Sequence, residues 1–267
     1  MGEAREFEGK VAIVTGGATG IGLATATVLA RRGAAVMICA RNADRVAAAA
    51  RAACEAGLRV EGFAGDVTRA AEMQRLIAAT VQGFGGVDIL VNNAAAMTTG
   101  SVVDTDEAAW DLVVDTSLKG AYLASRAAIP EMTRRGGGAI VHVASQHAFA
   151  TSKGRAAYTA AKAGLAGLTR AMALDHAGDG IRVNAVCPGA TDTEFLRGGW
   201  AALNPGAPLD PLIAALGAKH PLGRVGKPED VAEAIAFLAS SRAAFLTGVL
   251  LPVEGGTLAR LSIAPQG

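Results

Sequence analysis

The sequence contains few aromatic residues, few charged residues and few cysteines. Of its 267 residues, 4% are aromatic, 18% are charged and three are cysteine. The cysteines lie far apart and match neither a zinc-ligand spacing nor a disulfide framework, which is typical of a protein from a reducing cytoplasm and predicts no metal site. The formal net charge is +1. Because there is also no run of like charges, we expect no nucleic-acid partner.

The sequence also lacks a convincing membrane segment. Residues 11–30 carry no charge and match the length of a membrane span. However, this stretch holds four glycines and four threonines, and it divides into a short β-branched run and a loop. Residues 1–10 are charged and have no apolar core of a signal peptide. We therefore predict a cytoplasmic protein that does not bind a membrane.

Glycine, in contrast, is abundant, with 34 residues that show no three-residue period, which excludes collagen. The remaining pattern alternates short apolar runs with longer helical segments, as in βαβ units of one parallel sheet. The predicted strands are Val11–Thr15, Ala35–Ala40, Val60–Ala64, Ile89–Asn92, Ala139–Val143, Arg182–Val186 and Val249–Val253. The predicted helices are Ile21–Arg32, Ala43–Ala56, Ala70–Phe84, Asp106–Thr133, Ala156–Ala177 and Pro228–Ser240. Residues 191–222, rich in Gly and Pro, are predicted to form an irregular lid.

A glycine-rich turn follows the first predicted strand and opens the first helix. Its glycines are Gly16, Gly17, Gly20 and Gly22. A dinucleotide site needs a sharp turn, close approach of a pyrophosphate to backbone N–H groups, and tight packing of helix on sheet. The helix N-terminus then favours the phosphate charge. The alternative is a plain glycine turn, but the strand before and the helix after favour a dinucleotide.

The end of the second strand bears on the choice of dinucleotide. An acidic residue there selects NAD, whereas a nearby Arg accommodates the 2′-phosphate of NADP. Ala40 supplies no carboxylate and Arg41 follows it, which favours NADP(H) over NAD(H), although Arg41 is alternatively a solvated residue. Asp66, after the third strand, either contacts the adenine or caps the next helix, and for an isolated Asp the cap is favoured.

Two residues at helical spacing carry the predicted chemistry. Tyr158 and Lys162 are four apart, so they lie on one helix face. A phenol with a pKa near 10 is a poor base at neutral pH, but an ammonium and a positive nicotinamide ring lower that pKa. Tyr158 then takes a proton from an alcohol, or returns one to a ketone. Ser145, at the end of the fifth strand, is placed to bond the substrate oxygen. Taken alone, each of these residues has an ordinary structural explanation.

Taken together, these motifs resemble the short-chain dehydrogenase/reductase family from Lys10 to about Gly256. The matching segments are the TGxxxGIG turn at 15–22, the NNAG-like Asn92–Ala94, Ser145 with the Tyr158–Lys162 pair, the PGxxxT segment at 188–193, PLGR at 221–224 with PED at 228–230, and the closing TG…GG at 247–256. The resemblance implies one Rossmann-like α/β domain over residues 1–267, with seven parallel strands in the order 3-2-1-4-5-6-7, and a homo-oligomer (dimer or tetramer).

The resemblance also implies the site residues. Cofactor contacts are expected from Gly16, Thr19, Gly20, Ile21, Gly22, Asp66, Val67, Asn93, Ala94, Pro188, Gly189, Thr191 and Thr193, as well as from Tyr158 and Lys162, with Lys162 bonding the nicotinamide ribose. The family's catalytic Asn corresponds here to Ser117, which puts the proton relay through the lysine in doubt. Two milder departures are Ala95 in place of a glycine and Glu254 in place of an Asp.

The predicted function is therefore hydride transfer between a secondary alcohol or ketone and NAD(P), with a small-molecule substrate. The alternatives are reduction of a 3-oxoacyl thioester or a dienoyl-CoA, and a non-catalytic dinucleotide-binding regulator. Substrate contacts are assigned to His147 and Phe149 after the fifth strand and to Phe195 and Trp200 in the lid. Arg197 is a further candidate for an anionic substrate, but these residues do not identify the substrate.

Overall fold

The computed structural model describes residues 5–260, so both ends of the expected 1–267 domain lie outside the described residues. The strands are β1 (Val11–Thr15), β2 (Ala35–Ala40), β3 (Val60–Ala64), β4 (Ile89–Asn92), β5 (Gly138–Val143), β6 (Ile181–Pro188) and β7 (Leu250–Val253). They form one seven-stranded parallel sheet in the order β3-β2-β1-β4-β5-β6-β7. The strand order implied by the family resemblance is confirmed.

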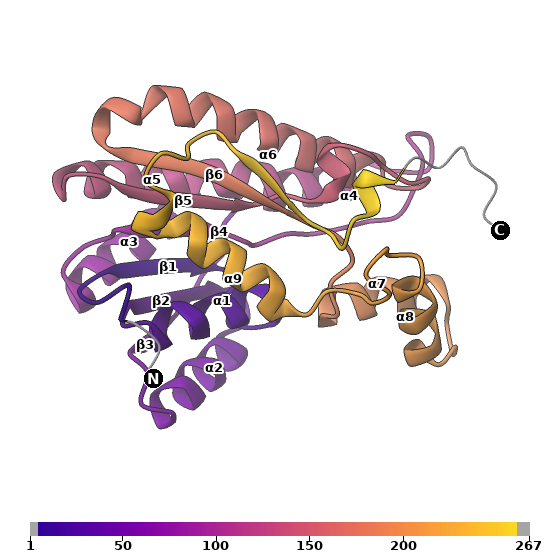
Figure 1. Ribbon diagram of the computed structural model, residues 1–267, viewed down its shortest axis with the longest axis horizontal. Helices are drawn as coiled ribbons and strands as arrows, with labels where there is room; N and C mark the ends of the chain where they lie inside the picture. Colours follow the sequence, from indigo (N-terminus) through magenta and orange to yellow (C-terminus); the bar gives the residue numbers. More distant parts are fainter. Residues whose placement is uncertain (1–4, 261–267) are drawn as a thin grey trace.

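Helices cover both faces of this sheet (Figure 1). The helices are α1 (Gly20–Arg31), α2 (Ala43–Glu55), α3 (Ala70–Phe84), α4 (Glu107–Val114), α5 (Gly120–Arg134), α6 (Ala156–Asp175), α7 (Glu194–Leu203), α8 (Leu209–Gly217) and α9 (Pro228–Ala239). Alternate side chains of a strand point to opposite faces, so Val14 packs toward α1 and α9, whereas Ile13 packs toward α3 and α5. Both faces are apolar, as expected for a buried parallel sheet.

Two sequence-based expectations about helices are wrong in detail. The single helix predicted over Asp106–Thr133 is divided into α4 and α5 by a π-helical turn at Asp115–Lys119. Residues 191–222 are not irregular, because α7 and α8 lie within them. Pro211 falls in the first turn of α8, where no intrahelical N–H bond is lost. Figure 1 shows α7 and α8 standing apart from the layered part of the molecule.

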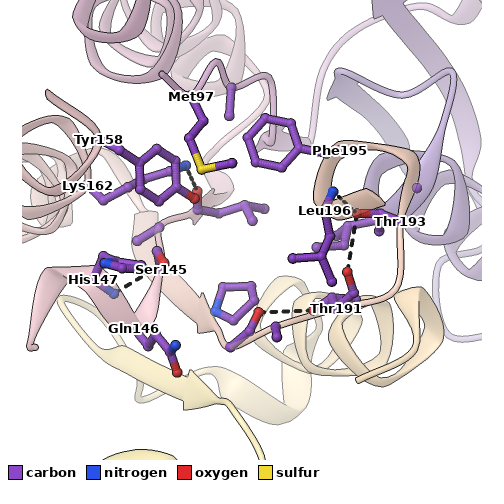
Figure 2. Close-up of a pocket in the computed structure, with 18 of the residues that line it drawn as sticks. Met97, Ser145, Gln146, His147, Tyr158, Lys162, Thr191, Thr193, Phe195 and Leu196 are labelled. Carbon is purple, nitrogen blue, oxygen red and sulfur yellow. Dashed lines mark hydrogen bonds between the residues drawn. The ribbon is translucent and has the colours of Figure 1, made fainter. Parts of the chain in front are cut away.

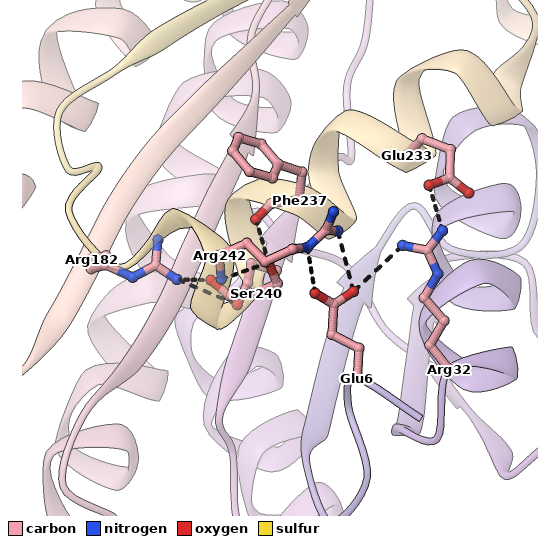
Figure 3. Close-up of polar contacts among 8 residues, drawn as sticks. Glu6, Arg32, Arg182, Glu233, Phe237, Ser240 and Arg242 are labelled. Atoms are coloured by element: carbon pink, nitrogen blue, oxygen red, sulfur yellow. Dashed lines mark hydrogen bonds and ion pairs between the residues drawn. The ribbon is translucent and has the colours of Figure 1, made fainter. Parts of the chain in front are cut away.

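Three arginines, of which Arg32 and Arg182 are partly buried, tie the end of α9 to the sheet and to the N-terminal segment (Figure 3). Arg182 of β6 donates to the carbonyl oxygens of Leu238 and Ser240 at 2.8 and 3.0 Å, which satisfies free carbonyls at the C-terminus of α9. Glu6 forms ion pairs with Arg32, just after α1, and with Arg242, just after α9. These contacts hold α1 and α9 together on one face of the sheet.

The described part of the chain contains no helix that is long and apolar enough to span a membrane. The charge-free stretch at 11–30 is instead β1, a turn and the first part of α1.

Candidate active site

A cavity of about 380 Å³ lies at the carboxyl edge of the sheet. Its wall combines the turn after β1, the segments that follow β4, β5 and β6, and side chains of α6 and α7. A second cavity of about 310 Å³ lies at the ends of β2 and β3. Gly16, Thr19 and Ala94 line both cavities, so the two adjoin. They meet between β1 and β4, where the strand order reverses, which is the usual ligand site of an open α/β sheet.

The glycine turn forms a backbone cradle between the two cavities. Gly16 has a φ of +64°, a conformation that L side chains rarely adopt. A Cβ on Gly22 would lie 2.1 Å from the carbonyl oxygen of Gly16, so only glycine permits this approach of α1 to the turn. Because α1 begins at Gly20, its first N–H groups have no intrahelical partner and are available to an anion. The cradle fits the pyrophosphate of a dinucleotide.

Asn93 holds this cradle against the end of β4. Its Nδ2 donates to the carbonyl oxygens of Thr15 and Gly16 at 3.0 and 3.1 Å. The backbone N–H groups of Asn93 and Ala94 donate to the Thr15 hydroxyl at 3.1 and 3.2 Å. Asn93 was expected to contact the cofactor; in the structure its amide fixes the shape of the glycine turn.

The second cavity has two arginines at its rim. Arg41 lines it, and so does Arg45, which lies four residues further on in the first turn of α2. Arg45 was not predicted from the sequence. Ala40 lines it too and contributes no carboxylate. The Arg45 guanidinium forms an ion pair of 2.7 Å with Glu194, the first residue of α7. This pair links the wall of the second cavity to the helix that covers the first.

Asp66 and Val67 also line the second cavity. The favoured expectation that Asp66 caps α3 is wrong, because its Oδ1 accepts from the backbone and hydroxyl of Thr68 at 2.9 Å and the residue that precedes α3 is Arg69. Burial raises the pKa of Asp66, but these hydrogen bonds and the charge of Arg41 outweigh it and hold the pKa below its usual value. The carboxylate therefore stays ionised at the cavity wall.

Ser145, Tyr158 and Lys162 come together in the first cavity, as Figure 2 shows. Tyr158 and Lys162 extend from the same face of α6 and are both buried. The Lys162 Nζ lies 5.6 Å from the centre of the Tyr158 ring and donates to the carbonyl oxygen of Val143 at 2.6 Å. Ser145 follows β5, where its Oγ accepts from the backbone N–H of His147 at 3.2 Å.

Burial shifts both ionisable groups toward their neutral forms. It raises the pKa of the Tyr158 phenol, although a hydrogen bond with Ser145 and the charge of Arg155 act in the opposite direction. It lowers the pKa of Lys162 to about 8. A lowered pKa was expected for the Tyr158 phenol, but the protein's own groups alone do not lower it.

Ser117, which stands where the family has its catalytic Asn, does not line either cavity. It lies in the π-helical turn, and its Oγ accepts from the N–H of Ala96 at 3.1 Å and donates to the carbonyl of Ala96 at 3.2 Å. A hydroxyl has a single proton, so the bond to Ala96 leaves none for a relay. Ser117 anchors the segment after β4 in this structure.

The substrate residues expected from the sequence divide into two groups. His147, Phe195 and Trp200 line the first cavity, with His147 edge-on to Tyr158 at 5.6 Å between ring centres. Phe149 is half exposed and is not among the lining residues. The assignment of Phe149 to the substrate site is wrong because a short 3-10 turn at Gln146–Ala148 directs the chain away from the cavity after His147.

Further lining residues were not anticipated: Met97, Arg155, Leu196 and Leu216. No local motif marks them, because the tertiary packing of loops and of α7 and α8 brings them to the cavity. The remaining expected cofactor residues, namely Thr19, Gly20, Ile21, Pro188, Gly189, Thr191 and Thr193, all line the first cavity. Among the residues that the structure describes, no group of three His, Cys, Asp or Glu side chains is placed to hold a metal ion.

Comparison with known proteins agrees with this architecture. A family model described as "Enoyl-(Acyl carrier protein) reductase" matches residues 16–257. The chain is 44% identical over 259 residues to cis-4-hydroxycyclohexanecarboxylate dehydrogenase of Sinomonas cyclohexanicum, covering 96% of this chain and 98% of that protein. It is 41% identical over 254 residues to 2-(S)-hydroxypropyl-CoM dehydrogenase 3 of Xanthobacter autotrophicus, covering 95% of this chain and 98% of that protein.

Among solved structures, aldohexose dehydrogenase of Thermoplasma acidophilum superposes with a TM-score of 0.89 at 32% identity, covering 99% of this chain and all of that one. The relatives span nearly the full chain and are named as dehydrogenases of hydroxyl compounds. The chain therefore belongs to the short-chain dehydrogenase/reductase family and is an oxidoreductase that acts on CH–OH groups with a nicotinamide dinucleotide.

Proposed function

We propose that this protein interconverts a secondary alcohol and a ketone, with Tyr158 as the general acid/base. The observation that carries the proposal is the convergence of Ser145, Tyr158 and Lys162 in the cavity that also contains the glycine turn. A regulator that only binds a dinucleotide has no need of these three side chains in one cavity. When bound, the oxidised nicotinamide supplies the hydride acceptor for the carbinol carbon.

The proton then moves at the Tyr158 Oη. In oxidation of the alcohol, the phenolate takes the hydroxyl proton while the Ser145 Oγ holds the same substrate oxygen by a hydrogen bond. In reduction of the ketone, the phenol returns that proton. The side chains of Phe195 and Trp200 give the cavity an apolar wall.

Lys162 supports the phenolate only while it is charged. Its pKa of about 8 lies below the raised pKa of Tyr158, so the lysine releases its proton before the phenol does as pH rises. The ammonium therefore stabilises the phenolate most effectively below about pH 8, together with the charge of Arg155 and that of the oxidised cofactor. Lys162 also has donors left for the nicotinamide ribose beyond its bond to Val143.

We further propose a preference for NADP(H). Arg41 and Arg45 both line the second cavity, which adjoins the phosphate turn and so suits the adenosine half of a dinucleotide. Ala40 presents no carboxylate to repel a 2′-phosphate.

The substrate named for the 44% identical relative carries a hydroxyl and a carboxylate on one ring. For this protein we propose a hydroxyl compound of comparable size as the substrate.

We also propose a cytoplasmic location, supported by three free cysteines.

The first test removes the phenol proton. We expect Tyr158→Phe to lower kcat by about a thousandfold, because general acid/base catalysis typically contributes factors of this order. Cofactor affinity, measured by fluorescence titration with NADPH, should stay within about twofold because the phenol acts on the substrate proton. Tyr122→Phe on the exposed face of α5 is the matched control. Unchanged turnover in Tyr158→Phe would refute the mechanism.

The second test concerns cofactor choice. Ala40→Asp combined with Arg41→Ala should weaken NADPH binding by about tenfold or more and strengthen NADH binding, because a carboxylate replaces a cation beside the ribose. Arg51→Ala, an exposed residue further along α2, is the control that should change neither affinity. A parent protein that already binds NADH more tightly than NADPH would contradict the proposal.

The third test uses the lysine as a pH probe of stability. The pKa of Lys162 is about 8 in the folded protein and near its ordinary value of 10.5 when unfolded. Between these pH values the unfolded chain binds the additional proton, so the free energy of unfolding rises with pH, by about 3 kcal/mol over the window. Lys162→Met removes this contribution. Urea unfolding from pH 7 to 10 should therefore show wild-type stability rising relative to Lys162→Met, and parallel profiles would contradict the lowered pKa.

A further inference from the structure

In the described part of the chain, one arginine in the wall of the first cavity has no acidic partner. Two cationic side chains line that cavity, Arg155 and Lys162, and none of its described lining residues is Asp or Glu. Arg155 immediately precedes α6, three residues before Tyr158. Within residues 5–260, its guanidinium makes one hydrogen bond, from Nη1 to the Thr99 hydroxyl at 3.2 Å, and no ion pair. Most of its five N–H donors are thus left for a ligand.

Arg155 lines the same cavity as Tyr158 and His147, and its charge acts on both of them. After the larger effects of burial and of the Ser145 hydrogen bond, the Arg155 charge lowers the pKa of Tyr158. After burial, it also lowers the pKa of His147. Both of these residues line the same cavity as Arg155. A group held by the guanidinium would therefore share the cavity that contains the Tyr158 hydroxyl.

The arginine that the sequence suggested for an anionic substrate is unsuitable. Arg197 is held by both carboxylate oxygens of Asp192, at 2.6 and 3.0 Å, and by Asp210 at 2.8 Å. Its charge is neutralised within the lid, and it does not line the cavity. Arg155 is a cavity cation that no carboxylate of the described residues neutralises.

The rest of the cavity wall specifies the shape of the ligand. Met97, Phe195, Leu196 and Trp200 present apolar surface, which suits a hydrocarbon body. A single free guanidinium matches a single negative charge, and its planar fork fits the two oxygens of a carboxylate. A phosphate dianion would bring a second charge with no second cation, since Lys162 is bonded to Val143 and belongs to the catalytic group.

We propose that Arg155 binds a carboxylate of the substrate, so that the physiological substrates are hydroxy acids and the corresponding oxo acids with an apolar body. This inference rests on the proposed function, because it places the substrate carbinol at Tyr158. The carboxylate is unchanged by the reaction: it fixes the orientation of the substrate while the carbinol carbon and its hydroxyl lose a hydride and a proton.

Binding is tested without turnover. Protein saturated with NADP⁺ is titrated calorimetrically with cyclohexanecarboxylate and with the neutral, nearly isosteric cyclohexanecarboxamide. We expect the carboxylate to bind about 10- to 100-fold more tightly, the range expected for a charged hydrogen bond. Arg155→Gln should abolish the preference and Arg155→Lys should retain part of it. Arg170→Gln, an exposed arginine on the same helix, is the matched control and should leave the preference unchanged.

Turnover provides the second readout. The ratio of kcat/KM for cis-4-hydroxycyclohexanecarboxylate to that for its carboxamide should be about tenfold or more, and close to one in Arg155→Gln. Equal binding of the acid and amide by the wild type, or a preference that Arg155→Gln leaves intact, would overturn the proposal. If carboxylate binding depends on Arg155 but no alcohol is oxidised, the proposed function fails and the binding site stands.

Discussion

The hydrogen bonds between the turn after β1 and Asn93 after β4 fix the arrangement on which the rest of the site depends. Thr15 and Asn92 are register partners, so the two chains leave the sheet side by side. Asn93 then bonds the carbonyls of Thr15 and Gly16, while the Thr15 hydroxyl accepts from the segment after β4. This junction holds the glycine turn against Ala94 and Ala95, which line both cavities.

The proposed catalytic groups depend on a bound cofactor because burial shifts both of them toward their neutral forms. A phenol whose pKa is raised and a lysine whose pKa is about 8 form a poor acid/base pair by themselves. In the proposed mechanism, the positive charge that favours the phenolate comes from Lys162 while it is protonated, from Arg155 and from the bound oxidised cofactor. We therefore expect cofactor binding to favour proton transfer at Tyr158.

The order of elements, the parallel sheet and the convergence of Ser145, Tyr158 and Lys162 in one cavity were predictable from the sequence because each depends on motifs within it. Apolar runs such as Ile89–Asn92 and the spacing of Tyr158 and Lys162 carry that information directly. The π-helical turn was not predictable, since residues 115–119 keep a helical composition while one turn is widened. Arg45 was missed because its ion-pair partner, Glu194, is far away in the sequence. Arg155 was missed because only the folded structure shows which acidic side chains lie near an arginine. The single-domain organisation over the whole chain and the homo-oligomer stay predictions.

The central claim is that the crevice between β1 and β4 holds a dinucleotide with its nicotinamide facing Tyr158. A crystal structure of the protein with NADP⁺ tests it most directly. We expect the pyrophosphate to lie on the N–H groups between Gly16 and Gly22, the 2′-phosphate beside Arg41, and the nicotinamide ring in the first cavity next to Gly189 and Tyr158. A cofactor bound elsewhere, or a nicotinamide ring outside the cavity that contains Tyr158, would contradict the account.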